Sequence, residues 1–205
     1  MRGQLRHRRH KDILREIKEA VDNGVTKLTL LGQNANAYED NGVNFFRLVK
    51  SVNSVRGLQE FSFITSHPKD TGIELFKAMA DCSKLRKYLH LPLQSGSDRI
   101  LKLMQRGYTR KFYLELAQDY RKIVPGGALT TDIIVGFPTE SEEDFQDTLA
   151  AARDIRFNAA YIFKYSPRPH TAAERLTDDV PEPEKDRRHS AVLALQKAIS
   201  RGKGG

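Results

Sequence analysis

The sequence predicts an α/β protein with five parallel strands, each followed by a polar loop and a helix. Short apolar runs, typical of buried strands, alternate with segments whose apolar residues recur at the helical period. This alternation favours parallel strands joined by right-handed crossovers. The loops that leave the strands also carry more Gln, Asn, Ser, Thr and His than the turns that enter them. Because α/β folds bind ligands at the carboxyl ends of their strands, this asymmetry favours an enzyme.

The five strands are predicted in order by runs such as TKLTLL and EFSFIT, and they cover residues 26–31, 60–65, 86–91, 128–135 and 159–164. Amphipathic helices are expected before the first strand, over residues 12–23, and between the strands, over residues 44–57, 73–82, 97–107, 109–124 and 142–155. Asn44 and Thr109 stand where helix N-caps are needed, and Ser141 with Asp144 has the spacing of a capping box. A Pro- and Asp-rich connection, 177–183, precedes a last helix. We therefore expect a barrel domain over 1–177, then a linker, helix and flexible tail over 178–205.

Composition narrows the class of protein. At 205 residues the chain fits one domain with an appendage, and its net charge of +8 favours an anionic partner such as nucleic acid, although a basic protein without such a partner is an equal alternative. No apolar run reaches the ~20 residues that span a bilayer, and no signal peptide is visible. The single cysteine, Cys82, excludes an internal disulfide and fits the reducing cytoplasm.

The segment RGQLRHRRHK, residues 2–11, is strongly basic. It has the charge to hold phosphates. A frayed basic terminus is the more common situation for such a segment, and both interpretations stay open.

The stretch TTDIIVGFPTE, residues 130–140, predicts a buried strand that breaks at Gly136 and turns into a helix. This geometry brings backbone N–H groups to a ligand, although an ordinary turn has the same signals. In the loop after the third strand, Gln94 and Ser95 suit a ribose or an amino-acid end, whereas Ser97 or Asp98 is expected to cap the next helix.

The other polar candidates have competing structural explanations. Asp132 lies in an apolar run, so it needs a hydrogen-bond donor. Lys164 and Arg168 have the charge to meet a phosphate or carboxylate, or they belong to a solvated face. His67 and His90 lack a second ligand at metal-binding spacing, which favours structural histidines, and Cys82 is expected in the core. The sequence contains no Walker loop, Rossmann fingerprint or nucleophile elbow.

Taken together, the loop motifs LLGQNANAY, FITSHPKD, LHLPLQSGSDRILKLMQRGYTR, LTTDIIVGFPTESEEDF and FKYSPRPHT resemble, in order and spacing, the radical S-adenosylmethionine domain of the MiaB-type tRNA methylthiotransferases. The resemblance runs from Arg2 to about Ile199. His170 and Thr139 depart from glycines common in that family. The resemblance implies a partial (β/α) barrel, open on one side for RNA, with its first strand missing here.

The resemblance also implies a chemistry. Sulfur and a methyl group are added at C2 of N6-isopentenyladenosine beside the tRNA anticodon, by a 5′-deoxyadenosyl radical formed on reductive cleavage of S-adenosylmethionine. Partners implied are the tRNA anticodon stem-loop, a sulfur donor and an electron donor. Positions carried over to the S-adenosylmethionine site are, in this chain, Gln94, Ser95, Thr65, Ser66, Thr131, Asp132, Ile134, Gly136, Glu140, Lys164 and Tyr165.

One departure from the family concerns its 4Fe-4S clusters. The family holds its radical cluster on three cysteines in a CxxxCxxC loop, and clusters need thiolates. This chain has only Cys82. We therefore expect a fragment that does not cleave S-adenosylmethionine by itself. Two alternatives are a cluster-free protein that binds tRNA without catalysis, and a barrel enzyme for a phosphate ligand, for which the sequence offers no convincing phosphate loop.

Overall fold

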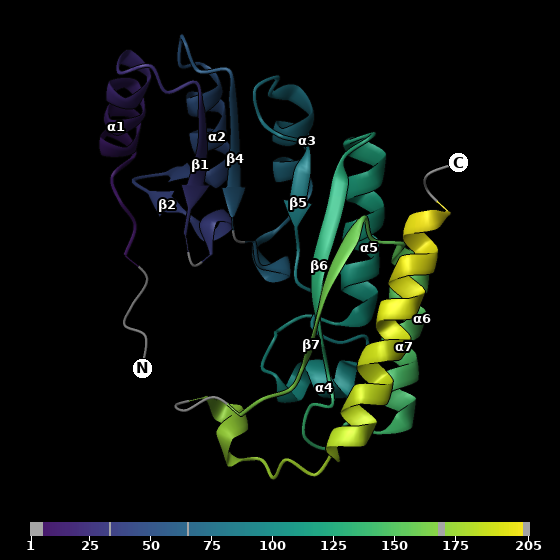
Figure 1. Cartoon of the computed structure of the whole chain (residues 1–205). Helices are drawn as coiled ribbons and strands as arrows, with labels where there is room; N and C mark the ends of the chain where they lie inside the picture. Colours follow the sequence, from purple (N-terminus) through teal and green to yellow (C-terminus); the bar gives the residue numbers. More distant parts are fainter. Residues whose placement is uncertain (1–5, 33, 65, 168–170, 203–205) are drawn as a thin grey trace. The chain divides into compact units, whose positions relative to one another are not determined.

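The computed structural model of the chain describes residues 6–32, 34–64, 66–167 and 171–202. It divides into two compact units, which are treated separately (Figure 1). The first comprises residues 1–90 and 119–127, and the second comprises 91–118 and 128–205. Helix α5 (Arg110–Ile123) contributes residues to both units.

The first unit is built on two paired parallel strands. Strand β1 (Lys27–Leu31) pairs with β4 (Glu60–Ile64), and residues 84–86, which lead into β5 (Tyr88–His90), run parallel to β4 on its other side. Helices α1 (His10–Asp22), α2 (Phe45–Asn53) and α3 (Ile73–Asp81) alternate with these strands. Asn44 caps α2, as predicted, by accepting a hydrogen bond from the amide of Arg47.

The polar loops of the first unit bind one another. The Asn36 amide donates to the carbonyl oxygen of His67 at 3.1 Å and to the Thr71 hydroxyl at 2.6 Å, and it accepts from the His67 amide at 3.0 Å. Asn34 donates to Asp70 in the same way. The loops after β1 and β4 are therefore held together by their own side chains, which accounts for much of their polarity.

The second unit contains the other parallel pair, β6 (Ala128–Val135) and β7 (Ala159–Lys164). Helices α4 (Asp98–Leu103), α6 (Glu142–Ile155) and α7 (Glu182–Arg201) complete it. Side chains alternate across β6. Ile133 and Val135 enter a core formed with α6 and α7, whereas Asp132 and Ile134 face the opposite side and line a cavity.

All five predicted strands are present, and where the pairing between them is described it is parallel. The predicted strand 86–91 is shorter, spanning Tyr88–His90. The last helix begins earlier than the predicted linker allows, at Glu182, because Pro183 is tolerated in a first turn where no backbone N–H is needed. The division at residue 177 remains a prediction.

A short hairpin was not predicted. Strands β2 (Glu39–Asp40) and β3 (Val43–Asn44) pair in antiparallel fashion around Asn41 and Gly42, whose φ values are 48° and 79°. Asn-Gly is a strong signal for a two-residue hairpin turn, so the sequence contained the information. Short 3-10 turns also occur at residues 35–37, 68–70 and 172–175.

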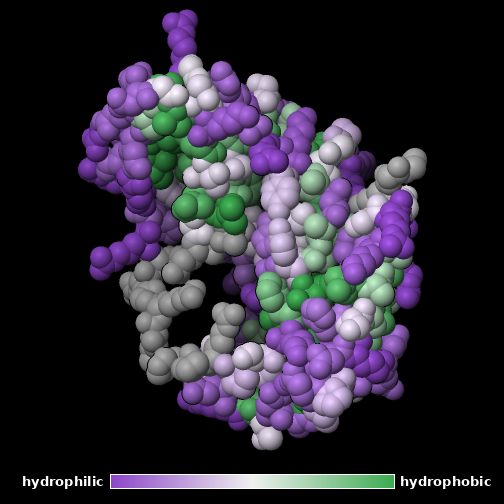
Figure 2. Space-filling view, in the orientation of Figure 1, coloured by the Kyte–Doolittle hydropathy of each residue, from purple (hydrophilic) through white to green (hydrophobic). Residues whose placement is uncertain are grey.

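The face seen in Figure 2 is mostly hydrophilic, with smaller areas of apolar surface. Among the large apolar side chains of the described segments, that of Leu31, at the end of β1, is the most exposed, with 80% of its surface accessible. On β7, Tyr161 and Phe163 are about half exposed. None of the helices in the described segments has both the length and the apolarity to cross a bilayer.

Candidate functional site

A cavity of about 580 Å³ lies in the second unit, where the carboxyl ends of β6 and β7 meet the residues after α4. Five of the residues assigned to the cofactor by resemblance line it, namely Gln94, Asp132, Ile134, Lys164 and Tyr165. They come from three separate segments of the chain. The fold thus brings together residues that are as far as 71 positions apart (165 − 94).

Gln94 has an unusual conformation at this cavity. Its φ of 68° lies in the left-handed region, which non-glycine residues seldom adopt. Its backbone extends the sheet, because its amide donates to the carbonyl of Asp132 and its carbonyl accepts from the amide of Ile134, both at 2.8 Å. The side chain is buried, and its Oε1 atom has no hydrogen-bond partner among the described residues. A buried acceptor in this state is complementary to a ligand that donates a hydrogen bond.

Lys164 lines the cavity, but its ammonium group is directed elsewhere. Its Nζ atom forms ion pairs with Glu182 and, at 2.9 Å, with Asp186, both on α7. Hydrogen bonds from this ammonium, to Glu182 first, raise the pKa of Lys164. Arg168, the second cation of the predicted pair, lies outside the described residues.

Tyr165 and Phe137 form an aromatic wall of the cavity. Their rings meet edge to face with centroids 5.1 Å apart, and both residues line the cavity. The Tyr165 hydroxyl donates to the carbonyl of Ala173 at 3.3 Å. Burial raises the pKa of Tyr165. Aromatic faces of this kind suit a planar heterocycle.

Ser95 and Thr131 do not line the cavity. Both are fully buried. The Ser95 hydroxyl lies 3.3 Å from the hydroxyl of Thr148 and accepts from the amide of Ser97 at 3.2 Å, and the Thr131 hydroxyl accepts from the amide of Leu93 at 2.8 Å. These side chains hold the loop that carries Gln94. Their assignment to the cofactor remains a prediction.

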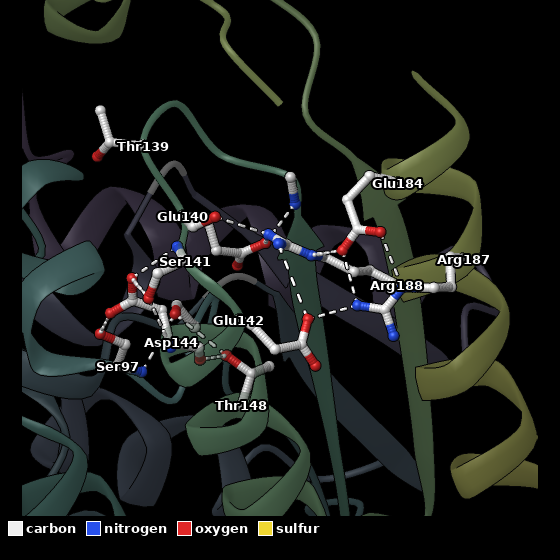
Figure 3. A network of polar contacts seen from close by, with 12 residues as sticks. Ser97, Thr139, Glu140, Ser141, Glu142, Asp144, Thr148, Glu184, Arg187 and Arg188 are labelled. Atoms are coloured by element: carbon white, nitrogen blue, oxygen red, sulfur yellow. Dashed lines mark hydrogen bonds and ion pairs between the residues drawn. The ribbon is translucent and has the colours of Figure 1, made fainter. Parts of the chain in front are cut away.

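Gly136 and Glu140 form the turn after β6, shown in Figure 3 around Glu140. Gly136 has a φ of 69°, and its amide donates to Oε2 of Glu140 at 2.7 Å. Arg188 of α7 donates to the same oxygen at 2.7 Å and to the Glu140 carbonyl at 2.8 Å. Burial raises the pKa of Glu140, while the bonds from Gly136 and Arg188 oppose this shift. Neither Gly136 nor Glu140 is among the residues that line the cavity.

A second polar network joins α4 to α6 (Figure 3). Ser141 and Asp144 form the predicted capping box, with the Asp144 amide donating to the Ser141 hydroxyl and the Ser141 amide donating to the Asp144 carboxylate. Asp144 also accepts from Ser97, the N-cap of α4, and from Arg99. Burial raises the pKa of Asp144, but the bonds from Arg99, Ser97 and Ser141 together outweigh it and hold that pKa well below its usual range.

The remaining predicted residues belong to the first unit or are not described. Thr65 lies outside the described residues, and Ser66 is buried in the first unit. His67 caps a 3-10 turn through its ring nitrogen, which accepts from the amide of Lys69. Cys82 is buried at the end of α3, as predicted for a core residue, and burial raises the pKa of its thiol.

Part of the basic N-terminal segment lines a second cavity, of about 520 Å³, in the first unit. Arg6 and Arg8 lie on it beside apolar residues of α1 and β1. Arg8 pairs with Glu16 and Arg9 pairs with Asp12 in exposed contacts, so part of this positive charge is already matched by the protein.

Several cavity residues were missed by the sequence reasoning. Phe137 and Phe163 supply apolar surface, and Met104 and Arg106 follow α4 at its margin. Phe163 was recognisable from strand alternation, because β7 directs Ala160 and Ile162 into the core and leaves its neighbours on the other face. The segment at Met104 and Arg106 carried no local signal beyond a helix end.

The geometry defines an α/β protein with parallel strands and a cavity at the carboxyl ends of β6 and β7. The sequence pattern of the Radical SAM superfamily matches residues 1–152, and the chain belongs to that superfamily. It is 46% identical, over 99% of its length, to the tRNA-2-methylthio-N(6)-dimethylallyladenosine synthase of Moorella thermoacetica, and 47% identical over 92% to that of Endomicrobium trichonymphae. The chain spans about half the length of these relatives, 46% and 45%.

Solved structures share the fold at low sequence identity. Coproporphyrinogen III oxidase (HemN) from Escherichia coli, described as a radical SAM enzyme, matches with a TM-score of 0.70 and 17% identity over 93% of this chain and 46% of its own. The cobalamin-dependent S-adenosylmethionine radical enzyme OxsB, solved with aqua-cobalamin and S-adenosylmethionine, matches with a TM-score of 0.60 and 12% identity over 92% of this chain and 26% of its own. The predicted radical SAM fold is therefore confirmed.

The cavity fits one of the two cofactors of this superfamily. The Oε1 atom of Gln94, buried and without a partner among the residues described, and the aromatic wall suit a nucleoside-containing ligand such as S-adenosylmethionine. A 4Fe-4S cluster does not fit the residues of this chain, because such a cluster needs several thiolates and the one cysteine, Cys82, is buried directly after α3. Within the described residues, no group of three or more His, Cys, Asp or Glu side chains is placed to hold a metal ion.

Proposed function

We propose that this chain is the S-adenosylmethionine-binding core of a tRNA methylthiotransferase. The protein built on it would add a methylthio group at C2 of N6-isopentenyladenosine, next to the tRNA anticodon. The observation that carries the proposal is the convergence of Gln94, Asp132, Ile134, Lys164 and Tyr165 on one cavity. The names and the 44–47% identity of the curated relatives support the reaction class.

Each side chain has a defined part in this proposal. Gln94 accepts a hydrogen bond from the ligand through its buried Oε1, and its amide and carbonyl remain committed to β6. Ile134, Phe137 and Tyr165 exclude water from a planar base. S-adenosylmethionine, when bound, supplies the 5′-deoxyadenosyl and methyl groups. Ser95, Thr131, Gly136 and Glu140 support the loop and the turn beside the cavity, whereas Thr65 and Ser66 are assigned to the cofactor by resemblance alone.

The proposal also covers the binding partners and the cellular compartment of the protein. The net charge of +8 suits the anticodon stem-loop of a tRNA. The iron–sulfur chemistry implied by the family requires cysteines that this chain does not contain, together with a sulfur donor and an electron donor. Cysteine usage suits a cytoplasmic protein, where thiols remain reduced.

Isothermal titration of the 205-residue chain with S-adenosylmethionine tests the proposal. We expect one site per chain, with competition by S-adenosylhomocysteine and none by ATP. A chain that is folded by circular dichroism but binds neither S-adenosyl compound would overturn the assignment of the cavity.

A second candidate is a tRNA-binding protein without catalysis. The single cysteine and the positive charge favour it. It predicts tRNA binding whose logarithmic affinity falls linearly with the logarithm of salt concentration, with no affinity for S-adenosylmethionine. Binding measurements with S-adenosylmethionine and with tRNA therefore distinguish the two candidate functions.

A further inference from the structure

Two cations of α7 reach the turn that supports the aromatic wall of the cavity. Arg188 and Lys185 are buried, which is uncommon for charged side chains unless they are paired. In Figure 3 the Arg188 guanidinium extends from α7 to Glu140, between the first turn of α6 and the turn after β6. Neither cation lines the cavity, so neither is expected to touch the ligand.

Arg188 fixes the backbone of the turn. Its Nη1 atom donates to the carbonyl oxygen of Glu140 at 2.8 Å and to Oε2 at 2.7 Å, and its Nε donates to Glu184 at 2.7 Å. Oε2 also receives the amide of Gly136 at 2.7 Å, and the Glu140 amide donates to the carbonyl of Phe137 at 2.9 Å. The Glu140 carboxylate therefore joins both ends of the turn that carries Phe137, and the Arg188 guanidinium holds that carboxylate in place.

Lys185 fixes the other half of the wall. A Cβ atom at Gly136 would lie 2.4 Å from Lys185 Cγ, so the lysine stem occupies the space that a side chain there would need. The Nζ atom lies 5.7 Å from the centroid of the Tyr165 ring and forms an ion pair with Asp178 at 2.7 Å. Tyr165 contacts Lys185 and packs edge to face on Phe137, whose turn is bonded to Arg188 through Glu140. Both aromatic rings are therefore supported by side chains of α7.

We propose that Arg188 and Lys185 are positioning residues of the cofactor cavity, acting through Glu140, Gly136 and Tyr165. This inference rests on the proposed function for the identity of the ligand. A planar, five-donor guanidinium is required at position 188, since the ammonium of lysine cannot bind Glu140 and Glu184 in the same forked geometry. A side chain that only balanced the charge of Glu140 would not need that geometry.

The first experiment compares Arg188→Lys with Arg187→Lys. Arg187 is the adjacent residue on α7, half exposed, and it pairs with Glu142 and Glu184 but not with Glu140. Two readouts are used: hydrogen exchange of the 134–140 amides, and the dissociation constant of S-adenosylmethionine by titration. We expect Arg188→Lys to speed exchange at Gly136 and to weaken binding about tenfold, because a turn that holds its binding conformation about a tenth of the time lowers the apparent affinity by that factor. Arg187→Lys should change neither readout.

The second experiment separates positioning from stability. Arg188→Met leaves a buried carboxylate unpaired and risks unfolding, whereas the double variant Arg188→Met/Glu140→Gln removes both charges. We expect the double variant to regain the thermal midpoint of the parent but not its affinity or its protection at Gly136. The proposal would be overturned if the double variant regained the thermal midpoint, the affinity and the protection at Gly136 together. It would also be overturned if Arg188→Lys changed neither exchange nor affinity.

The exchange measurement keeps this proposal distinct from the proposed function. If the parent chain binds no S-adenosylmethionine, the proposed function fails. The role of Arg188 in positioning the turn is then tested by hydrogen exchange alone. The proposal holds if Arg188→Lys speeds exchange of the Gly136 amide and Arg187→Lys does not.

Discussion

The hydroxyl of Ser97 donates to the carboxylate of Asp144 at 2.5 Å, which joins the N-cap of α4 to the capping box of α6. Two helices that start 44 positions apart (142 − 98) thus share one acceptor. This contact lies beside the loop that carries Gln94, and it fixes where that loop ends.

Asp144→Asn should destabilise the second unit by about 2 kcal/mol, because the neutral amide replaces a buried carboxylate that accepts from Ser97, Ser141 and Arg99. Urea unfolding followed by circular dichroism measures this. Asp147→Asn is the matched control on the same helix, since its carboxylate is half exposed and pairs only with Arg110 among the contacts described. Equal losses in the two variants would contradict the prediction.

The cost of Asp144→Asn should depend on pH. The folded protein holds the pKa of Asp144 below its ordinary value, so its stabilisation is complete above the unfolded pKa of about 4 and is lost as the pH falls toward the folded pKa. The difference in unfolding free energy between parent and variant should be constant from pH 7 to 5 and shrink below about pH 4. A difference that stays flat down to pH 3 would argue against this ionisation.

Gly136→Ala should cost about 2–4 kcal/mol in stability, since it combines a left-handed φ with a clash against the Lys185 stem. Gly126→Ala is the control: its φ is 75°, but nothing lies within 4 Å of the added Cβ, so we expect only about 1 kcal/mol. Adding Lys185→Ala to Gly136→Ala should recover part of the loss. Thermal unfolding of the parent, the two single glycine variants and the double variant measures these losses. Equal losses of stability in Gly136→Ala and Gly126→Ala would contradict a clash with Lys185.

Gln94→Met should separate binding from stability. It removes a buried oxygen that has no partner in the described structure, so stability should stay the same or rise slightly. Affinity for S-adenosylmethionine should fall about tenfold if that oxygen accepts a ligand hydrogen bond. Titration and thermal unfolding measure the two effects, and Gln118→Met, on the exposed surface of α5, is the control. Unchanged affinity would remove Gln94 from the site.

The 205-residue chain, incubated anaerobically with S-adenosylmethionine and dithionite, should form no 5′-deoxyadenosine above the buffer rate. One cysteine cannot supply three thiolates to a cluster. Liquid chromatography of the products tests this, and deoxyadenosine formed in proportion to the chain would refute it.

The strands and helix caps could be predicted because their signals are local. Asn44, Thr109 and Ser141 each bond to an amide within three positions of the chain, which a sequence pattern captures. The site was predicted only in part. Gln94 and Ser95 are adjacent and both polar, yet Gln94 lines the cavity whereas Ser95 is fully buried and does not.

The contribution of α7 was not predictable for a different reason. Arg188 lies 48 positions from Glu140, inside a run of charges that resembles a solvated helix face. Only the packing of α7 on β7 and α6 decides which of Arg187 and Arg188 is buried. The same long-range packing pairs Lys164 with Glu182 on α7.

Two sets of ion pairs bind α7 to the rest of the second unit, and they differ in their exposure to solvent. Lys164 meets Glu182 and Asp186 where both carboxylates are about 60% exposed, whereas Arg188 and Glu140 are almost sealed from solvent. Dissolved salt screens the first contact strongly and the second very little. Raising the ionic strength should therefore loosen the contact between the end of β7 and α7 at Lys164, while the bond between Arg188 and Glu140 persists.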